Sequence, residues 1–188
     1  MNIAILGTGK VASVLGASWK KKGHTIVYGS RTPQGPDQKL YAAAVAAADV
    51  VVVAIPGTVA ASALAELKLD WSGKIVLDAT NRFDGGPSSF GGIVPAVSGA
   101  HVCKVFNSVG VEVMANPVYG NERAAMFYAG DDPKAKEVAR ALAADVGFEP
   151  VDLGGSNTVP GLEAMVAGLW FPLAQKYGRG TGLRVLIR

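Results

Sequence analysis

The sequence predicts an α/β fold: a doubly wound, mostly parallel sheet with a small C-terminal helical extension. Short apolar runs alternate with helix-length segments along most of the 188 residues. The run DVVVVAIP at 49–56 is apolar on both faces, as a central strand of a parallel sheet must be when helices cover it on either side. The 24 glycines fit a chain with many tight strand-to-helix turns.

The predicted elements follow one another in a regular order. Strands are expected at 2–7, 24–30, 49–56, 74–80, 101–107, 124–130 and 148–154. Helices are expected at 10–22, 37–48, 58–68, 109–115 and 133–146, with a glycine-rich loop at 84–92. The stretch 37–48 is assigned to helix because it is rich in alanine, the strongest helix former. This alternation indicates right-handed crossovers within a single sheet.

The chain from residue 155 onwards has a different pattern. Residues 161–178 predict a long apolar helix interrupted at Pro172. No linker precedes this stretch. We therefore expect an α/β domain over 1–154 and a helix and tail over 155–188 that pack on it as one compact unit.

Composition and charge narrow the function classes. The formal net charge is only +3, and the densest basic cluster, Lys20-Lys21-Lys22, is typical of a solvated helix end, so no nucleic-acid partner is expected. Met1 leads straight into an apolar strand pattern, and no run is long enough to cross a bilayer. A single cysteine, Cys103, excludes an internal disulfide. We expect a cytoplasmic protein with no membrane partner.

The first loop has the pattern G-x-G-x-x-A, directly after a strand and at the start of a helix. Gly7 permits the tight turn, Gly9 lets the backbone approach a pyrophosphate, and Ala12 allows close helix packing. The helix start supplies free N–H donors and the positive end of a dipole. In this context the motif predicts a Rossmann domain that binds a dinucleotide through Gly7, Thr8, Gly9, Lys10 and Val11.

The end of the second strand predicts which dinucleotide binds. An NAD site would place Asp or Glu there to accept from the ribose 2′-OH, but this chain has no carboxylate before Asp37. Arg31 can offer its guanidinium to a 2′-phosphate, and the hydroxyls of Ser30 and Thr32 can add hydrogen bonds. The sequence therefore favours NADP(H) over NAD(H).

The ends of the later strands are expected to line the same crevice. Ala54, Ile55 and Pro56 are predicted to contact the cofactor, with Pro56 beside the ribose or nicotinamide. Asn81 is a predicted cofactor contact as well. Asn107 and Ser108 are polar residues that follow an apolar strand, so they could hold a carboxamide or a second substrate, although helix caps and turns favour the same residue types.

Other common catalytic arrangements are missing from the sequence. His24 and His101 lie at strand beginnings, the sheet edge opposite the crevice, and no Cys/His cluster has the spacing of a metal site. No nucleophile elbow or Ser/His/Asp arrangement is visible. We expect no metal and no catalytic acid or base, because hydride transfer mainly needs two rings held in register.

Several segments resemble one known family. They are GTGKVASVLGASWKKKGHTIVYGSR at 7–31, VVVVAIP at 50–56, KIVLDATN at 74–81, KVFNSVGVEVMANP at 104–117 and the tail from 151. Together they are similar to the NADP oxidoreductases that depend on the deazaflavin coenzyme F-420, a superfamily that includes the cytosolic module of the six-transmembrane metalloreductases.

The resemblance implies a dimer, with Phe106, Asn107 and Ser108 near the docking site of a second coenzyme. This chain departs from the family pattern at Gly57, where a bulky residue often follows the proline, and at Arg82, where proline is common.

Three functions remain open at the level of sequence. The main hypothesis is an NADP(H)-dependent oxidoreductase that passes a hydride between NADPH and a flat small-molecule acceptor such as a deazaflavin or flavin. A reductase of a small imine or carbonyl is an alternative, although related enzymes carry a larger helical dimerisation domain. The third is a non-catalytic NADP(H)-binding redox sensor. A crevice without room for a second ring beside the nicotinamide would distinguish it from the two enzymes.

Overall fold

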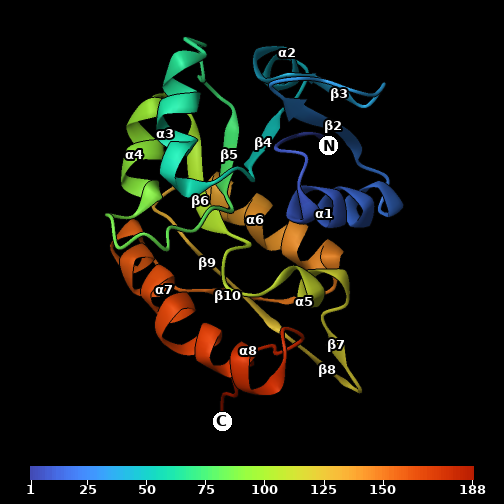
Figure 1. The fold of residues 1–188 in the computed structure, drawn as a ribbon, viewed down its shortest axis with the longest axis vertical. Helices are drawn as coiled ribbons and strands as arrows, with labels where there is room; N and C mark the ends of the chain where they lie inside the picture. The colour runs from blue at the N-terminus through green and yellow to red at the C-terminus, as the bar shows by residue number, and fades with distance from the viewer.

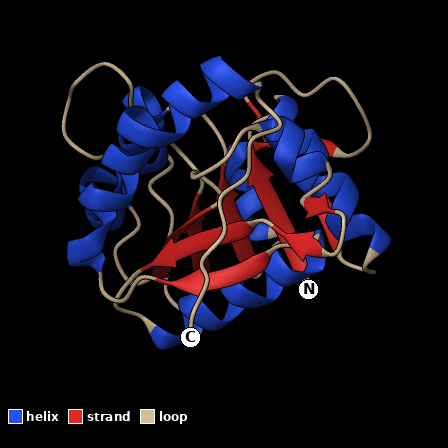
Figure 2. Ribbon diagram, turned by 90° about the horizontal axis from the view of Figure 1, so that it is seen from below, coloured by secondary structure: helices blue, strands red, loops and turns tan.

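A twisted sheet of eight strands forms the centre of the structure, a computed structural model that describes all residues 1–188 (Figure 2). The spatial order is β10-β9-β6-β5-β4-β1-β2-β3. The strands are β1 Asn2–Leu6, β2 Thr25–Ser30, β3 Gln38–Leu40, β4 Val50–Val53, β5 Ile75–Asp78, β6 His101–Val105, β9 Ala125–Ala129 and β10 Glu149–Asp152. A separate short hairpin consists of β7 Val118–Tyr119 and β8 Glu122–Arg123.

Helices cover both faces of the sheet (Figure 1). One face carries α1 Lys10–Lys21, α5 Val111–Ala115 and α6 Pro133–Val146, and the other carries α2 Tyr41–Ala46, α3 Gly57–Glu66 and α4 Ser89–Ala96. The strands divide their side chains between two cores. Ile3 and Ile5 of β1 pack in the core beneath α1, and Ala4 and Leu6 pack in the core beneath α3. The doubly wound prediction is confirmed.

The direction of the strands fixes where a site can form. β1 pairs in parallel with both β2 and β4, and β6 pairs antiparallel with β9. Six strands therefore end at one edge of the sheet, in the order 3-2-1-4-5-6 of a dinucleotide-binding fold, and the connections reverse direction beside β1. β9 and β10 run the opposite way and contribute no strand end to that edge.

The prediction of a single helix over the alanine-rich stretch 37–48 is wrong for the first part of that stretch. Gln38–Leu40 pair in parallel with Tyr28–Ser30 as strand β3, and the helix begins only at Tyr41. Pairing with the edge of the sheet overrides local helix propensity here.

The glycine-rich break at 84–92 contains the start of a helix that the sequence did not predict. The Ser88 hydroxyl caps α4 by accepting a hydrogen bond from the Phe90 N–H at 3.2 Å. Gly92 lies where a Cβ atom would come within 3.0 Å of Ala61 on α3. The glycine that obscured the helix is therefore what lets α4 pack closely against α3.

The C-terminal segment continues from a short 3₁₀ turn, Ser156–Thr158, through α7 Val159–Met165, a π-helical turn Val166–Trp170 and α8 Phe171–Tyr177. The predicted interruption at Pro172 is wrong in place, because the irregularity lies before the proline and the helix runs on through it. Pro172 has no N–H for a regular helical bond, and the wider π turn accommodates that missing donor. Leu162 of α7 packs on Ala125 and Phe127 of β9.

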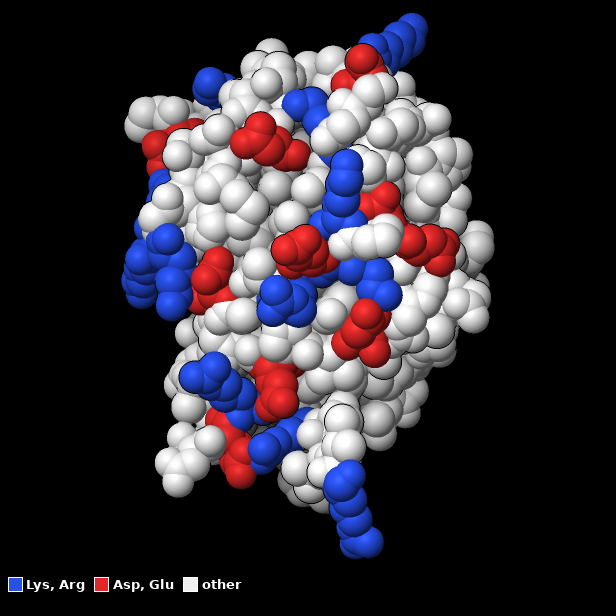
Figure 3. Space-filling model, turned by 180° about the vertical axis from the view of Figure 1, so that it is seen from behind, with Lys and Arg blue, Asp and Glu red and all other residues white.

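The surface shows no broad region of one charge on the face drawn in Figure 3, where basic and acidic side chains lie beside one another. No helix combines the length and the apolar character needed to cross a membrane.

Candidate functional site

Two adjoining cavities open at the edge where the six parallel strands end. The larger, of about 720 Å³, is lined by Gly7, Thr8, Gly9, Gly29, Ser30, Arg31, Thr32, Tyr41, Ala54, Ile55, Pro56, Thr58, Val59, Ser62, Ala63 and Glu66. The smaller, of about 400 Å³, is lined by Gly9, Lys10, Val11, Ala54, Pro56, Asn81, Phe83, Asn107, Val109, Gly110, Val111, Val166, Trp170, Phe171 and Arg179. We call them the first and the second cavity. They meet at Gly9, Ala54 and Pro56, which line both.

The turn after β1 depends on glycine at position 7. Gly7 has a φ of +129°, and a Cβ atom there would lie 2.5 Å from the Ala54 carbonyl oxygen. Its N–H donates to the Gly29 carbonyl at 3.0 Å, which ties the turn to the end of β2. The ends of β1, β2 and β4 are thus held together at the floor of the first cavity.

The start of α1 is open toward the cavities. Gly9 caps this helix without a side-chain hydrogen bond, no acidic residue lies in the first turn, and a Cβ atom at position 9 would meet nothing within 4 Å. The first N–H groups of the helix are therefore without a side-chain partner, and the space in front of them is free. Both features fit a diphosphate bound at a helix N-terminus.

The loop after β2 carries a free cation at the rim of the first cavity. The Thr32 N–H donates to Ser30 Oγ at 3.1 Å, which bends the chain around the exposed Arg31. Arg31 forms no ion pair with any carboxylate of the chain, although other basic residues such as Lys20 do. An unpaired guanidinium beside two hydroxyls fits a 2′-phosphate.

The departure from the family pattern at Gly57 has a structural cause. A Cβ atom at position 57 would lie 2.6 Å from the Asn81 carbonyl oxygen and 3.0 Å from Arg82 Cγ. The missing side chain therefore adds no space to the second cavity, because the segment after β5 occupies it. The first two turns of α3 also bring Thr58 and Ser62 into the first cavity. Sequence reasoning missed these two residues, for which the spacing after Pro56 was the one available signal.

Aromatic side chains form one wall of the second cavity. The ring of Phe171 lies 5.1 Å from that of Phe83 and 5.5 Å from that of Trp170, both in edge-to-face contact. Trp170 Nε1 donates to the Thr181 carbonyl at 2.8 Å, which fastens this wall to the tail. The sequence assigned Trp170 and Phe171 to a helix but did not place that helix at the crevice, because no local pattern shows where a C-terminal segment docks.

Lys10 and Arg179 are the charged residues that line the second cavity, and the Arg82–Asp84 pair flanks its Phe83. The Arg179 guanidinium stands 5.6 Å from the Trp170 ring and donates to Glu112 at 2.9 Å, and this hydrogen bond lowers the pKa of the Glu112 carboxyl. Arg82 donates twice to Asp84, at 3.0 and 2.6 Å. That pair lowers the pKa of Asp84 to about 2 and fixes the turn that carries Phe83.

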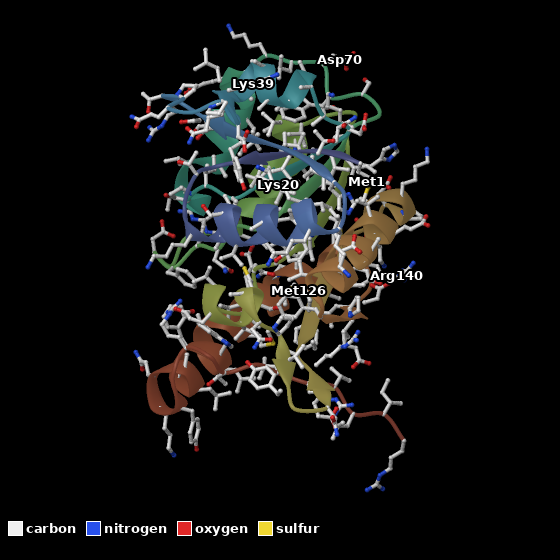
Figure 4. The ribbon with its side chains drawn as sticks, turned by 90° about the vertical axis from the view of Figure 1, so that its right-hand side faces the viewer. Met1, Lys20, Lys39, Asp70, Met126 and Arg140 are labelled. Atoms are coloured by element: carbon white, nitrogen blue, oxygen red, sulfur yellow. The ribbon has the colours of Figure 1, made fainter.

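The residues at the end of β6 separate into one that faces the cavity and two that do not. Asn107, one of the three residues predicted to lie near the second substrate, lines the second cavity. Phe106 is 1 % exposed and packs edge-to-face on Trp19 at 5.4 Å, and the buried Ser108 hydroxyl donates to Met126 Sδ at 3.5 Å. Met126 lies in the interior between α5 and α6 (Figure 4). The placement of the Phe106 and Ser108 side chains near the acceptor site is therefore corrected: alternate residues after β6 point into the core.

A buried ion cluster lies just beneath the crevice. The Lys104 ammonium is fully buried and donates to Asp78 at 2.9 Å, to Glu163 at 2.6 Å and to the Thr80 carbonyl at 2.7 Å. Its three N–H donors are all used, so Asp78 has a structural partner and no free face toward the cavities. The sequence showed Lys104 only as one polar residue within an apolar strand.

The remaining reactive side chains lie away from both cavities. His24 pairs with Asp145 and His101 pairs with Asp132, at the beginnings of β2 and β6. Burial raises the pKa of the Cys103 thiol to about 12. No group of three His, Cys, Asp or Glu side chains comes together as a metal site would require.

The fold and this crevice define the class of protein: a Rossmann-type dinucleotide-binding domain, the kind of domain on which NADP-dependent oxidoreductases are built. More particularly, residues 2–82 match the family described as NADP oxidoreductase, coenzyme F-420-dependent, which confirms the resemblance of the segments at 7–31, 50–56 and 74–81. The matched segment contains the glycine loop, Arg31 and Asn81, and it ends just after β5.

Similar solved structures extend the likeness over the whole chain. A candidate F-420-dependent NADP reductase from Arthrobacter sp. FB24 is 27 % identical, with a TM-score of 0.85, and the match covers 100 % of both chains. A hypothetical protein from Sinorhizobium meliloti is 28 % identical, with a TM-score of 0.70 over 99 % of this chain and 96 % of that one.

More distant structures share the fold. An imine reductase from Streptomyces aurantiacus is 15 % identical, with a TM-score of 0.68 over 94 % of this chain and 64 % of that one. A reductive aminase from Aspergillus terreus, in complex with a reduced NADP form, cyclohexanone and allyl amine, is 21 % identical, with a TM-score of 0.67. This chain covers 62 % of that aminase.

Proposed function

We propose that this protein transfers a hydride between NADPH and a flat acceptor, a deazaflavin or a flavin, that stacks on the nicotinamide in the second cavity. The observation that carries the proposal is that the two cavities meet at Gly9, Ala54 and Pro56. A dinucleotide that lies along the first cavity, with its diphosphate at the start of α1, would bring its nicotinamide to this junction. The aromatic wall then offers a surface for a second ring.

In this proposal the protein contributes to catalysis by positioning the cofactor and the acceptor. Bound NADPH would supply the hydride, while the first N–H groups of α1 hold the diphosphate and Arg31 holds the 2′-phosphate. Phe83, Trp170 and Phe171 exclude water from the ring of the acceptor. Two rings held face to face meet the main requirement of hydride transfer, which is orientation.

The alternative functions fit the second cavity less well. Reduction of an imine or a carbonyl needs a proton donor at the reacting atom, and no Asp, Glu, His or Tyr lines this cavity. Lys10 is the one lining residue that could donate a proton, and it stands at the start of α1, where this proposal places the diphosphate. A redox sensor would need no space beyond the nicotinamide, whereas about 400 Å³ adjoins it here. The likeness to imine reductases rests on fold and does not carry their substrates to this chain.

The direct test is hydride transfer from NADPH to deazaflavin, FMN, FAD, ferric chelates and a cyclic imine, followed by the loss of absorbance of the reduced nicotinamide. We expect turnover with a deazaflavin or a flavin. Measurable NADPH binding without turnover of any acceptor would instead support the sensor, and turnover of the imine alone would support the alternative enzyme.

The cofactor preference has its own test in Arg31→Ala. Loss of a charged hydrogen bond to the 2′-phosphate should weaken NADPH binding by roughly 1.5–3 kcal/mol and leave NADH binding nearly unchanged. Lys21→Ala, which removes one positive charge at the far end of α1, is the matched control and should change neither affinity. Equal losses of NADPH and NADH affinity in the Arg31 variant would contradict the assignment.

We also propose that the protein acts as a homodimer. Large exposed apolar side chains occur on the hairpin and the tail, at Val118, Tyr119, Leu186 and Ile187, and they support an interface in that region. Sedimentation at micromolar concentration should give twice the mass of the chain, and a monomer at the highest accessible concentration would contradict the dimer.

A further inference from the structure

The side chains of Asn81 and Asn107 form a hydrogen-bonded pair across the ends of β5 and β6. Asn81 Nδ2 donates to the Asn107 carbonyl at 2.7 Å, and Asn107 Nδ2 donates to Asn81 Oδ1 at 3.1 Å. Both residues line the second cavity. Asn107 Oδ1, by contrast, is buried and has no hydrogen-bond partner in the chain.

The chemistry of the pair fixes which atom is left over. A backbone carbonyl can only accept, so the Asn81 amide must turn its NH₂ group toward the Asn107 carbonyl. Asn81 Oδ1 then faces Asn107 and needs a donor, which only the Asn107 NH₂ group can supply. The free atom is therefore the oxygen of Asn107, and reversing either amide would place two acceptors in contact.

The backbone around Asn107 is held in this arrangement by a strained residue. Phe106 has a φ of +65°, a conformation that bulky side chains rarely adopt, and it is one of two non-glycine residues of the chain with positive φ. Its ring is locked in the core against Trp19. Strain that the surrounding core enforces is a common feature of binding sites. Here it turns the chain so that Asn107 faces the cavity while its neighbours face inward.

We propose that Asn107 Oδ1 accepts a hydrogen bond from the carboxamide N–H of the nicotinamide and thereby selects the ring face that meets the acceptor. The inference rests on the proposed NADPH site, because it places the nicotinamide at the junction of Ala54 and Pro56, beside the ends of β5 and β6. A buried acceptor without a partner is costly, so a ligand that brings a donor relieves it. Rotation of the ring by half a turn would move the carboxamide away from Asn107. Asn81 acts as a positioning residue, because it sets the orientation of the Asn107 amide.

The test compares NADPH with its reduced 3-acetylpyridine analogue, in which a methyl group replaces the carboxamide NH₂. Dissociation constants are measured by cofactor fluorescence, so the readout does not require turnover. The wild-type protein should bind NADPH about 10- to 100-fold more tightly than the analogue, since the analogue leaves the Asn107 oxygen unpaired. Asn107→Ala should bind both with similar affinity. Asn81→Asp, which can no longer donate to the Asn107 carbonyl, should reduce the ratio as well.

Ser108→Ala is the matched control, because its hydroxyl faces Met126 in the core, and it should keep the wild-type ratio. Should Asn107→Ala fail to fold, the ratio of the wild-type protein alone decides: a value near one overturns the inference. An unchanged ratio in a folded Asn107→Ala protein also overturns it, while NADPH binding itself stays intact. Failure of the wild-type protein to bind NADPH at all would instead contradict the proposed function.

Discussion

Gly7 and Gly9 belong to one motif, but the structure requires glycine at them for different reasons. At Gly7 the chain itself leaves no space, because φ is +129° and the Ala54 carbonyl lies 2.5 Å from the position of a Cβ atom. At Gly9 the chain leaves open space, since nothing lies within 4 Å of such an atom. The first glycine therefore serves the fold and the second serves the ligand.

This difference predicts opposite behaviour for two single substitutions. Gly7→Ala should lower the free energy of unfolding by about 1–3 kcal/mol, the usual cost of an enforced rare backbone conformation. Each kcal/mol lost should lower the melting temperature by roughly 2–4 °C. Gly9→Ala should lose no more than about 1 kcal/mol, because nothing crowds the new methyl group and only the weaker capping by alanine counts against it. Its methyl group should nevertheless weaken NADPH binding by roughly 1.5–3 kcal/mol by displacing the diphosphate.

Thermal unfolding with and without NADPH measures both effects. Each variant is the control for the other, because the same methyl group is added two residues apart. A Gly9→Ala protein that is strongly destabilised without cofactor, or that binds NADPH as the wild-type protein does, would refute this division of roles.

Residues of the glycine loop and of the loop after β2 could be predicted because their chemistry is local: both depend on a few consecutive residues after a strand. Asn81 and Asn107 could be named as polar groups at strand ends, but their pairing could not, since it joins residues 26 positions apart. Ser108 was misplaced for a related reason. The strain at Phe106 sets which of the three side chains faces the cavity, and no sequence pattern reports a positive φ at phenylalanine.

The helices and strands show the same difference between what local sequence predicts and what depends on distant contacts. Those with a strong local pattern, such as the apolar run of β4 and the amphipathic α6, lie within the ranges that the sequence predicted. Helix α4 was missed because it contains two glycines, of which Gly92 serves close packing on α3, and β3 was missed because an edge strand of three residues forms only by pairing with β2. The aromatic wall could not be predicted at all, because it depends on how the C-terminal helix docks below the sheet.

That docking depends on the buried Lys104, which joins β5, β6 and α7. Lys104→Met should remove roughly 3–5 kcal/mol from the free energy of unfolding, because it leaves the fully buried Asp78 carboxylate without its cation. Glu163→Gln should cost only about 1 kcal/mol, since the amide oxygen can still accept from Lys104 and this side chain is 11 % exposed.

Urea unfolding of the two variants tests this order. The Lys104 variant should also bind the acceptor more weakly, with a smaller effect on the binding of NADPH. The reason is that Trp170 and Phe171, which form the wall of the second cavity, follow α7 in the same C-terminal segment. A Lys104→Met protein as stable as the wild-type protein would show that the cluster is not needed to hold the helix. Loss of NADPH affinity alone would show that the cluster supports the other cavity.

At the scale of the whole molecule, the strand order determines where each half of the site lies. The six parallel strands bring the glycine loop, Arg31, Pro56, Asn81 and Asn107 to one edge. The two reversed strands turn the chain back so that the C-terminal helix closes the second cavity. Cofactor binding should therefore stabilise the sheet as a unit, and Cys103 offers a probe of it, since it lies on central strand β6 at 0 % exposure.

Native Cys103 should react very slowly with thiol reagents. Its Sγ donates to the Ala129 carbonyl at 3.3 Å, and burial raises the pKa of the thiol to about 12. At pH 8 only a very small fraction of the native thiols would be ionised, against about a quarter of free thiols with a pKa of 8.5. Labelling should thus report opening of the sheet rather than the reactivity of the native thiol, and it should become fast in concentrated urea.

NADPH should slow this labelling in proportion to its binding if the sheet opens only by global unfolding. At a free concentration of 100 times the dissociation constant, a ligand that binds the folded state alone stabilises it by about 2.7 kcal/mol, so labelling should slow about 100-fold. At the same NADPH concentration, an Arg31→Ala protein whose dissociation constant has risen tenfold should be protected only about tenfold. Labelling that NADPH leaves unchanged, in a sample where binding is measured directly, would show that β6 opens locally, and the sheet would then not behave as one unit that the cofactor stabilises.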